Sequence, residues 1–171
     1  MANTINLRPP YLLFIGDLRE ATYAKTALGL VHWRRDRVVG QLRLAQVAVD
    51  LGVPDMDVES AAAAGAGSLI IGVATVGGVI PDSWWHVIRA AARHGLDIVS
   101  GLHGRLADNA ELVSDAERSG ANLIDVRVPP ANIPVGTGRK RSGKRVLTVG
   151  TDCAVGKKYS ALALTEALQS L

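Results

Sequence analysis

Cysteine and aromatic residues are scarce in this chain of 171 residues: it has one cysteine, Cys153, and an aromatic content of 4%. A single cysteine excludes an internal disulfide, and no Cys/His cluster has the spacing of zinc ligands, so we expect no metal site. No apolar run reaches the roughly 18 residues of a membrane span, and the apolar segment near the N-terminus is too short for a secretory signal. We therefore expect a cytoplasmic protein with no membrane partner.

The chain also has no excess of basic over acidic residues outside one segment. The formal net charge is +3, but five basic residues lie close together in the segment "RKRSGKR", at positions 139–145. Without that segment the rest of the chain is slightly acidic. The basic run is therefore expected to be a solvated connector rather than a nucleic-acid-binding surface, and no nucleic-acid partner is predicted.

Small and aliphatic residues are abundant: hydrophobic residues make up 48% of the chain, and glycine occurs 18 times. Short apolar runs predict buried strands at "YLLFIGD", "SLIIGVAT", "LDIVSG" and "ANLIDVRVP". Helical patterns separate most of these runs, which predicts right-handed βαβ crossovers. The expected fold is α/β, with a Rossmann-like, open and mostly parallel sheet whose ligands bind at the carboxyl ends of the strands.

Several local features follow from the same patterns. A helix over residues 18–29 is expected to end at Gly29, and two β-like runs, Leu30–Trp33 and Arg37–Leu42, form either a hairpin or two edge strands. The amphipathic stretch "PDSWWHVIRAAARHG" predicts a helix that Asp82 or Ser83 caps and Gly95 ends.

The segment "VPPANIPVGTGRKRSGKR" is rich in proline and glycine and has no periodicity, which is typical of a linker. We expect a Rossmann-like N-terminal domain at 1–128, a linker at 129–144 and the beginning of a P-loop domain at 145–171. In the last part "RVLTVG" predicts a new strand that leads through a loop into a helix from about Gly156.

The loop "GTDCAVGKK" resembles a phosphate-binding loop, in which backbone N–H groups and a lysine hold phosphate oxygens. Its spacing between Gly150 and Gly156 is one residue longer than the standard, and Lys158 replaces the hydroxyl residue that binds Mg²⁺. This departure argues against ATP hydrolysis and leaves an anion site open, as well as a glycine-rich turn without a ligand. The candidate cofactor-binding residues are Gly150, Thr151, Asp152, Gly156, Lys157 and Lys158.

Together with "AKTALGL", "GVATVGGVIPDSWWHVI" and "DIVSGLHGRLAD", this loop gives the chain a resemblance to the D-glutamate N-acetyltransferase family, from about Leu12 to Leu164. Members of that family have a Rossmann-like N-terminal domain and a larger C-terminal P-loop domain. The resemblance implies an acyltransferase that moves acetyl from acetyl-CoA to the amino group of a D-amino acid such as D-glutamate, in D-amino acid catabolism. It also implies a cytoplasmic homo-oligomer, of which this chain contains the first domain and only the beginning of the second, so that the chain alone is expected to be inactive.

Candidate substrate and catalytic residues follow predicted strands. His103 is the candidate general base, and Gly77 and Gly78 are candidates to present backbone amides to a carboxylate or an oxyanion. Arg105 and Arg127 are candidates to bind the carboxylates of an acidic amino acid. The alternatives are a hydrogen-bonded loop histidine, a flexible glycine turn and two surface salt bridges.

Two other functions remain open at this point. The loop is also similar to that of dethiobiotin synthetases, which have a threonine after the lysine, so an ATP-dependent ligase or kinase-like enzyme using ATP with Mg²⁺ is an alternative. A non-catalytic nucleotide-binding or assembly domain is another. NAD binding by the first domain is not favoured, because "IGDLRE" follows the first strand in place of the G-x-G-x-x-G fingerprint.

Overall fold

The computed structural model describes residues 5–45, 48–128, 132–133, 135–140, 142–151 and 155–171. The chain divides into two units, Met1–Ile133 and Pro134–Leu171, and each is described by itself. None of the helices in these residues has the length and apolarity that crossing a bilayer requires.

The first unit contains a five-stranded, fully parallel sheet of order β2-β1-β3-β4-β5. The strands are β1 Tyr11–Gly16, β2 Val38–Arg43, β3 Ser68–Ile71, β4 Asp97–Ser100 and β5 Leu123–Asp125. This arrangement confirms the predicted α/β, Rossmann-like fold. The strand order reverses between β1 and β3, so the carboxyl ends of these two strands form the switch point of the sheet.

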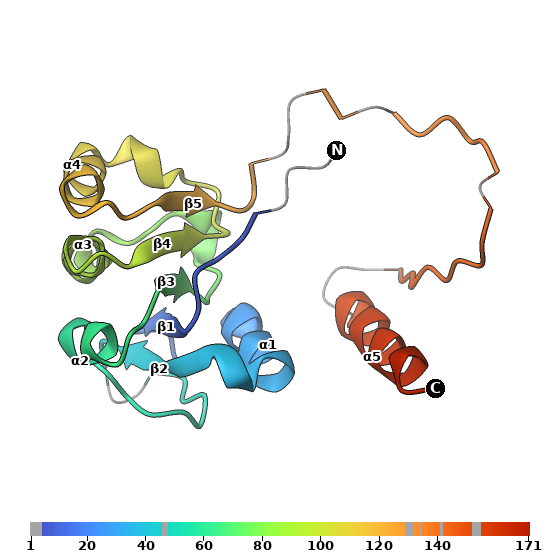
Figure 1. The fold of residues 1–171 in the computed structure, drawn as a ribbon, viewed down its shortest axis with the longest axis horizontal. Coiled ribbons are helices and arrows are strands. Elements are labelled where there is room, and N and C mark those ends of the chain that lie inside the picture. The colour runs from blue at the N-terminus through green and yellow to red at the C-terminus, as the bar shows by residue number, and fades with distance from the viewer. Residues whose placement is uncertain (1–4, 46–47, 129–131, 134, 141, 152–154) are drawn as a thin grey trace. The chain divides into compact units, whose positions relative to one another are not determined.

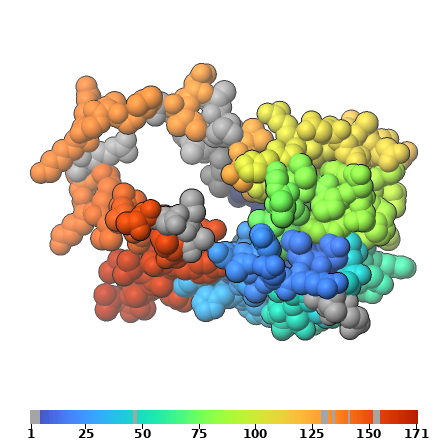
Figure 2. All heavy atoms as spheres, turned by 180° about the vertical axis from the view of Figure 1, so that it is seen from behind, coloured from blue at the N-terminus to red at the C-terminus, as the bar shows by residue number. Residues whose placement is uncertain are grey.

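Helices cover both faces of the sheet, as right-handed crossovers in two directions require. Figure 1 shows α1 (Lys25–Trp33) on one side and α2 (Val58–Ala63), α3 (Trp85–Arg93) and α4 (Ala110–Ser119) on the other. Within the first unit, side chains fill the space between the sheet and these helices, as its blue-to-yellow atoms in Figure 2 show from behind. Three short 3₁₀ turns, η3 Val76–Gly78, η4 Asp82–Trp84 and η5 Leu106–Asp108, follow β3 or β4 at the carboxyl edge.

The side chain of Trp84 fills the core at the switch point. It is fully buried, packs edge-on against Phe14 with 5.1 Å between the ring centroids, and donates its Nε1 hydrogen to Asp17 Oδ1 at 3.0 Å. A Cβ on Gly16 would lie 2.3 Å from the indole ring, so glycine is needed here for close packing.

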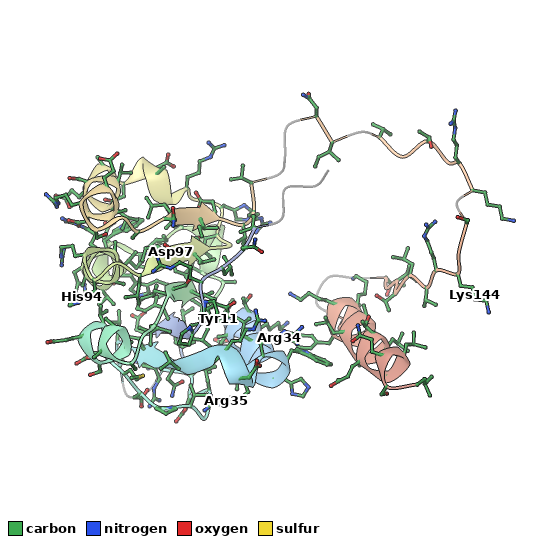
Figure 3. All side chains as sticks on the ribbon, viewed as in Figure 1. Tyr11, Arg34, Arg35, His94, Asp97 and Lys144 are labelled. Atoms are coloured by element: carbon green, nitrogen blue, oxygen red, sulfur yellow. The ribbon has the colours of Figure 1, made fainter. Side chains whose placement is uncertain are left out.

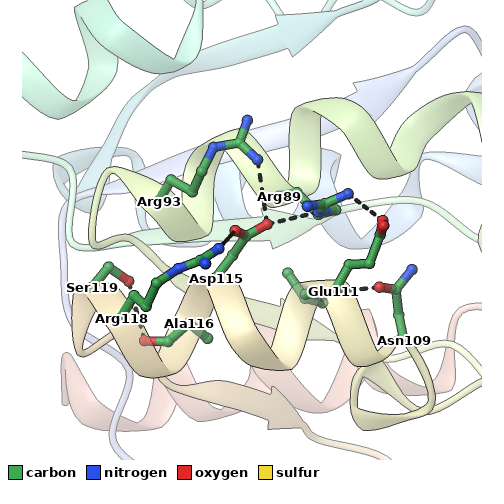
Figure 4. A network of polar contacts seen from close by, with 9 residues as sticks. Arg89, Arg93, Asn109, Glu111, Asp115, Ala116, Arg118 and Ser119 are labelled. Carbon is green, nitrogen blue, oxygen red and sulfur yellow. Dashed lines mark hydrogen bonds and ion pairs between the residues drawn. The ribbon is translucent and has the colours of Figure 1, made fainter.

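Two buried carboxylates, on α4 and β4, join neighbouring elements through hydrogen bonds. The Asp115 carboxylate on α4 is buried and accepts from Arg89, Arg93 and Arg118, at 2.7, 3.3 and 2.5 Å (Figure 4). Hydrogen bonding from Arg89 is the main reason why the pKa of Asp115 lies below its usual value. Asp97, labelled in Figure 3, is buried in β4 and accepts from the backbone and side-chain nitrogens of Asn122 at 2.8 and 3.0 Å.

Three local predictions around α1 and α3 are wrong. Helix α1 runs through Gly29 to Trp33, so the β-like run Leu30–Trp33 is helical, and β2 alone forms a parallel edge strand with no hairpin. Packing of the buried Ala27 close to Gly72, and of Leu30 and Val31 against the core, stabilises the helix against the cost of Gly29 of about 1 kcal/mol. Neither Asp82 nor Ser83 caps α3 with its side chain, because both belong to the 3₁₀ turn η4 that precedes it.

In the second unit, the predicted helix is present as α5 (Lys157–Gln169). The predicted strand "RVLTVG" is not: residues 145–150 are irregular, and Val146, Leu147 and Val149 are 79%, 82% and 78% exposed. A parallel strand needs neighbours for its hydrogen bonds, and the described residues offer none here. In the linker, Lys144 is exposed and extends away from the backbone (Figure 3).

Candidate functional site

The loop between β4 and α4 carries His103 and Arg105 at the carboxyl edge of the sheet. On one side the loop is held by the η3 turn, because the backbone nitrogens of His103 and Gly104 donate to the carbonyl of Gly78 at 2.9 and 3.2 Å. On the other side it is held by β5, because the Leu106 nitrogen donates to the Asp125 carboxylate. The exposed His103 and Arg105 side chains therefore start from a backbone that is fixed at both ends.

Gly77 and Gly78 lie next to this loop, as the strand order predicts. Both have a left-handed backbone, with φ of +72° and +68°. A Cβ on Gly78 would lie 2.2 Å from His103 Cδ2, whereas a Cβ on Gly77 would meet nothing within 4 Å. The Gly78 nitrogen donates to the Thr75 carbonyl at 3.0 Å, so the hydrogen of this amide is engaged within the turn.

A pocket of about 210 Å³ joins the end of β4 to the end of β5. Its lining consists of Leu102, His103, Gly104, Arg105, Asp125, Arg127 and Val128. Three of the residues predicted from the sequence, His103, Arg105 and Arg127, thus meet at one small cavity. It offers an imidazole, two guanidinium groups and one carboxylate to a ligand.

The carboxylate of this pocket, Asp125, was missed by sequence reasoning. Asp125 is the last residue of β5, pairs in register with Ser100 of β4, and accepts from the Leu106 nitrogen through both oxygens, at 3.3 and 3.2 Å. Burial raises the pKa of Asp125, and the hydrogen bond from Leu106 and the charge of Arg105 offset only part of this effect.

A larger pocket of about 660 Å³ lies between the end of β2, the start of α2 and the exposed side of α3. None of the site residues predicted from the sequence lines it. Two of its acidic groups already serve the fold: Asp55 accepts from Arg43 Nε at 2.8 Å, and Asp57 caps α2 by accepting from the Ser60 nitrogen at 2.7 Å. The small pocket is the better candidate for chemistry, because it brings together three residues that the sequence predicts.

The predicted phosphate loop belongs to the second unit. Gly156 precedes α5 with φ of +92°, and Lys157 begins the helix. A Cβ on Gly150 would lie 2.6 Å from Val155 and 3.2 Å from the side chain of Lys157, so the two described ends of the loop approach each other. Thr151 and Lys158 are exposed. Asp152 and Cys153 lie outside the described residues.

Comparison with known families finds two adjoining matches. Residues 40–129 match a domain of unknown function, DUF1611_N, described as a Rossmann-like domain. Residues 134–171 match the companion domain DUF1611_C, described as a P-loop domain.

Two curated relatives, from Tritonibacter scottomollicae and a Pseudoalteromonas species, are each named D-glutamate N-acetyltransferase. The first is 47% identical over 164 residues, which is 96% of this chain and 49% of the relative. The second is 42% identical over 165 residues, which is 96% of this chain and 50% of the relative. The chain thus spans about half the length of these relatives.

A solved structure is similar over the same extent. The crystal structure of a DUF1611 family protein from Anabaena variabilis has a TM-score of 0.78 and 32% sequence identity. The match covers 95% of this chain and 50% of that one.

Proposed function

Since the chain belongs to the DUF1611 family, we propose that it forms part of an N-acetyltransferase that moves acetyl from acetyl-CoA to the amino group of a D-amino acid such as D-glutamate. The observation that carries the proposal is the pocket with two guanidinium groups and an imidazole, in a chain whose curated relatives are named for this activity. We place the enzyme in the cytoplasm, in D-amino acid catabolism, as a homo-oligomer.

The pocket between β4 and β5 is proposed to bind the acceptor. Its volume of about 210 Å³ is below the range of about 300–1,000 Å³ that drug-sized ligands occupy, so it suits a small amino acid. Arg105 and Arg127 would bind the carboxylates of that amino acid, because a guanidinium group donates two parallel hydrogen bonds to a carboxylate. His103 would take the proton that the amino group must lose before it can attack a thioester.

The loop before α5 is proposed to hold the phosphates of CoA, through Gly150, Thr151, Asp152, Gly156, Lys157 and Lys158. The described residues fit a phosphate group. Gly156, directly before Lys157, leaves the backbone accessible, and the first N–H groups of helix α5 attract anions. Bound acetyl-CoA would supply an acetyl group activated as a thioester. Two neighbouring lysines provide positive charge there without a metal ion.

We propose that the chain consists of a Rossmann-like domain at 1–128, a linker at 129–144 and a P-loop segment at 145–171. In this division the first and the third segment each bind one ligand. The acceptor pocket lies within the first and the phosphate loop within the third. The whole protein's transfer reaction is proposed by similarity to relatives that are longer than this chain.

An ATP-dependent ligase or kinase-like enzyme is the second candidate, because the same glycine-rich loop and lysine would hold the phosphates of ATP. Lys158 speaks against it, since a serine or threonine at this position would bind Mg²⁺. A non-catalytic assembly domain is the third, supported by the exposed apolar side chains of Val146, Leu147 and Val149.

The test is an assay of thiol release from acetyl-CoA after addition of D-glutamate, without ATP or Mg²⁺. It is run on this chain beside the full-length Tritonibacter scottomollicae relative, and the N-acetylated product is identified by mass spectrometry. Release by this chain that depends on D-glutamate supports the proposal. If the relative releases thiol and this chain does not, acetyl transfer is restricted to the longer proteins. If neither protein releases thiol, the proposed reaction is contradicted.

A further inference from the structure

Asp125 has a position in the acceptor pocket that the proposed chemistry leaves unused. It is the last residue of β5, lines the pocket with Arg105 and Arg127, and is half-buried. Its two oxygens face the start of η5, where the Leu106 nitrogen donates to both of them. The carboxylate is therefore held in place by the backbone before any ligand binds.

The charge of Asp125 is only partly balanced in the protein. Burial raises its pKa, the neighbouring Asp108 adds to the effect, and Leu106 and Arg105 counteract it incompletely. A carboxylate in this state gains from a cationic ligand, because a positive charge nearby stabilises its ionised form. Arg105 and Arg127 are cations in the same pocket, but the proposed function assigns their guanidinium groups to the carboxylates of the ligand.

An acidic amino acid carries groups complementary to all three side chains. It has two carboxylates for the two guanidinium groups and one ammonium group for the one carboxylate. Two contacts alone leave the chiral carbon free to present either face, whereas a third, different contact makes the two enantiomers inequivalent. Discrimination between partners of equal composition needs such a contact, which one enantiomer cannot satisfy.

We propose that Asp125 is a specificity-determining residue that binds the ammonium group of the acceptor amino acid and thereby distinguishes its enantiomers. This inference rests on the proposed function, because it takes the pocket between β4 and β5 as the acceptor site. Asp125 acts before proton transfer: it orients the nitrogen that His103 would deprotonate.

The experiment is isothermal titration of the 171-residue chain with D-glutamate, L-glutamate and glutarate, which has both carboxylates but no ammonium group. The unmodified chain is expected to bind D-glutamate about tenfold or more tighter than glutarate, since a hydrogen bond to a charged group contributes more to affinity than one between neutral groups. Equal affinities for the two would overturn the inference without any substitution.

The Asp125→Asn variant separates ligand binding from loop support. Asparagine keeps an oxygen that accepts from the Leu106 nitrogen, so the loop stays in place while the charge is lost. Affinity for D-glutamate is expected to fall about tenfold or more, affinity for glutarate to change by less than about threefold, and the D/L preference to shrink. Asp108→Asn, which removes an exposed carboxylate outside the pocket lining, is the matched control and is expected to change both affinities by less than about threefold.

The outcomes separate the two proposals. If Asp125→Asn leaves the binding of D-glutamate and glutarate unchanged, or weakens both to the same extent, the role of Asp125 is overturned, while the assignment of the pocket as the acceptor site is retained. Failure of the unmodified chain to bind either ligand overturns the assignment of the acceptor site itself.

Discussion

Substituting alanine for Gly78 tests how the fold positions His103. The added Cβ would lie 2.2 Å from Cδ2, 2.9 Å from Cγ and 3.1 Å from Cβ of His103, so the imidazole must move. Gly77 is the matched control, because it shares the left-handed backbone, while its added Cβ would meet nothing within 4 Å.

The magnitude follows from two contributions. A left-handed backbone costs a residue with a Cβ about 1–2 kcal/mol, and both variants share this cost. Overpacking typically costs about 1–3 kcal/mol more, and only Gly78→Ala incurs it. Because His103 is exposed and its ring can rotate, we take the lower end and expect Gly78→Ala to be about 1 kcal/mol less stable than Gly77→Ala.

Urea unfolding, followed by circular dichroism, measures this difference. Repeating both substitutions in a His103→Ala background removes the ring and leaves only the 3.1 Å contact to Cβ, so the difference should fall below about 0.5 kcal/mol. Equal stabilities of Gly78→Ala and Gly77→Ala in the unmodified background would refute the reasoning.

Further substitutions test other parts of the account. Because the folded protein lowers the pKa of Asp115, its ionised carboxylate stabilises the fold at pH values above the ordinary aspartate pKa of about 3.9, and this stabilisation is lost as pH falls through the lower folded pKa. Asp115→Asn should therefore be less stable than the unmodified chain at neutral pH and should lose less stability below about pH 4. Thermal unfolding at each pH measures both effects. Trp84→Phe should cost about 2–4 kcal/mol in urea unfolding, because it removes the hydrogen bond to Asp17 and leaves a void, while a cost below about 1 kcal/mol would contradict the role of the indole. Arg127→Gln should weaken glutarate binding about tenfold in titration calorimetry, and unchanged binding would remove this arginine from the acceptor site.

The sheet could be predicted from the sequence because its strands are buried on both faces, which leaves short apolar runs such as "YLLFIG". The helix end at Gly95 could also be predicted, because this residue has the left-handed backbone, with φ of +76°, that glycine adopts at low cost. The resemblance to D-glutamate N-acetyltransferases, inferred mainly from the phosphate loop, is confirmed by the relatives.

The errors occur where contacts distant in sequence decide the structure. Gly29 has the sequence context of a helix end, but α1 continues to Trp33, because Leu30 and Val31 beyond it pack against the core. The segment 145–150 has the composition of a strand, but a strand exists only with hydrogen-bonded neighbours.

Part of the candidate site could also be predicted from the sequence. His103 and Arg105 follow one predicted strand, Arg127 stands near the end of the next, and the structure brings all three to one pocket. Asp125 was missed because the run "ANLIDVRVP" predicts a strand that continues beyond it, whereas β5 ends at Asp125. The end of a strand, and with it the edge of the sheet, depends on pairing with β4, which the sequence of β5 alone does not contain.

We propose that this chain holds the acyl donor through its phosphate loop without a metal ion. Isothermal titration with CoA, acetyl-CoA and ATP, each with and without Mg²⁺, tests it most directly, with Lys157→Ala as the loop variant and Lys144→Ala in the linker as its control. We expect binding of CoA and acetyl-CoA that is independent of Mg²⁺, lost in Lys157→Ala and retained in Lys144→Ala. Tight binding of ATP that requires Mg²⁺, with no signal from CoA or acetyl-CoA, would contradict it.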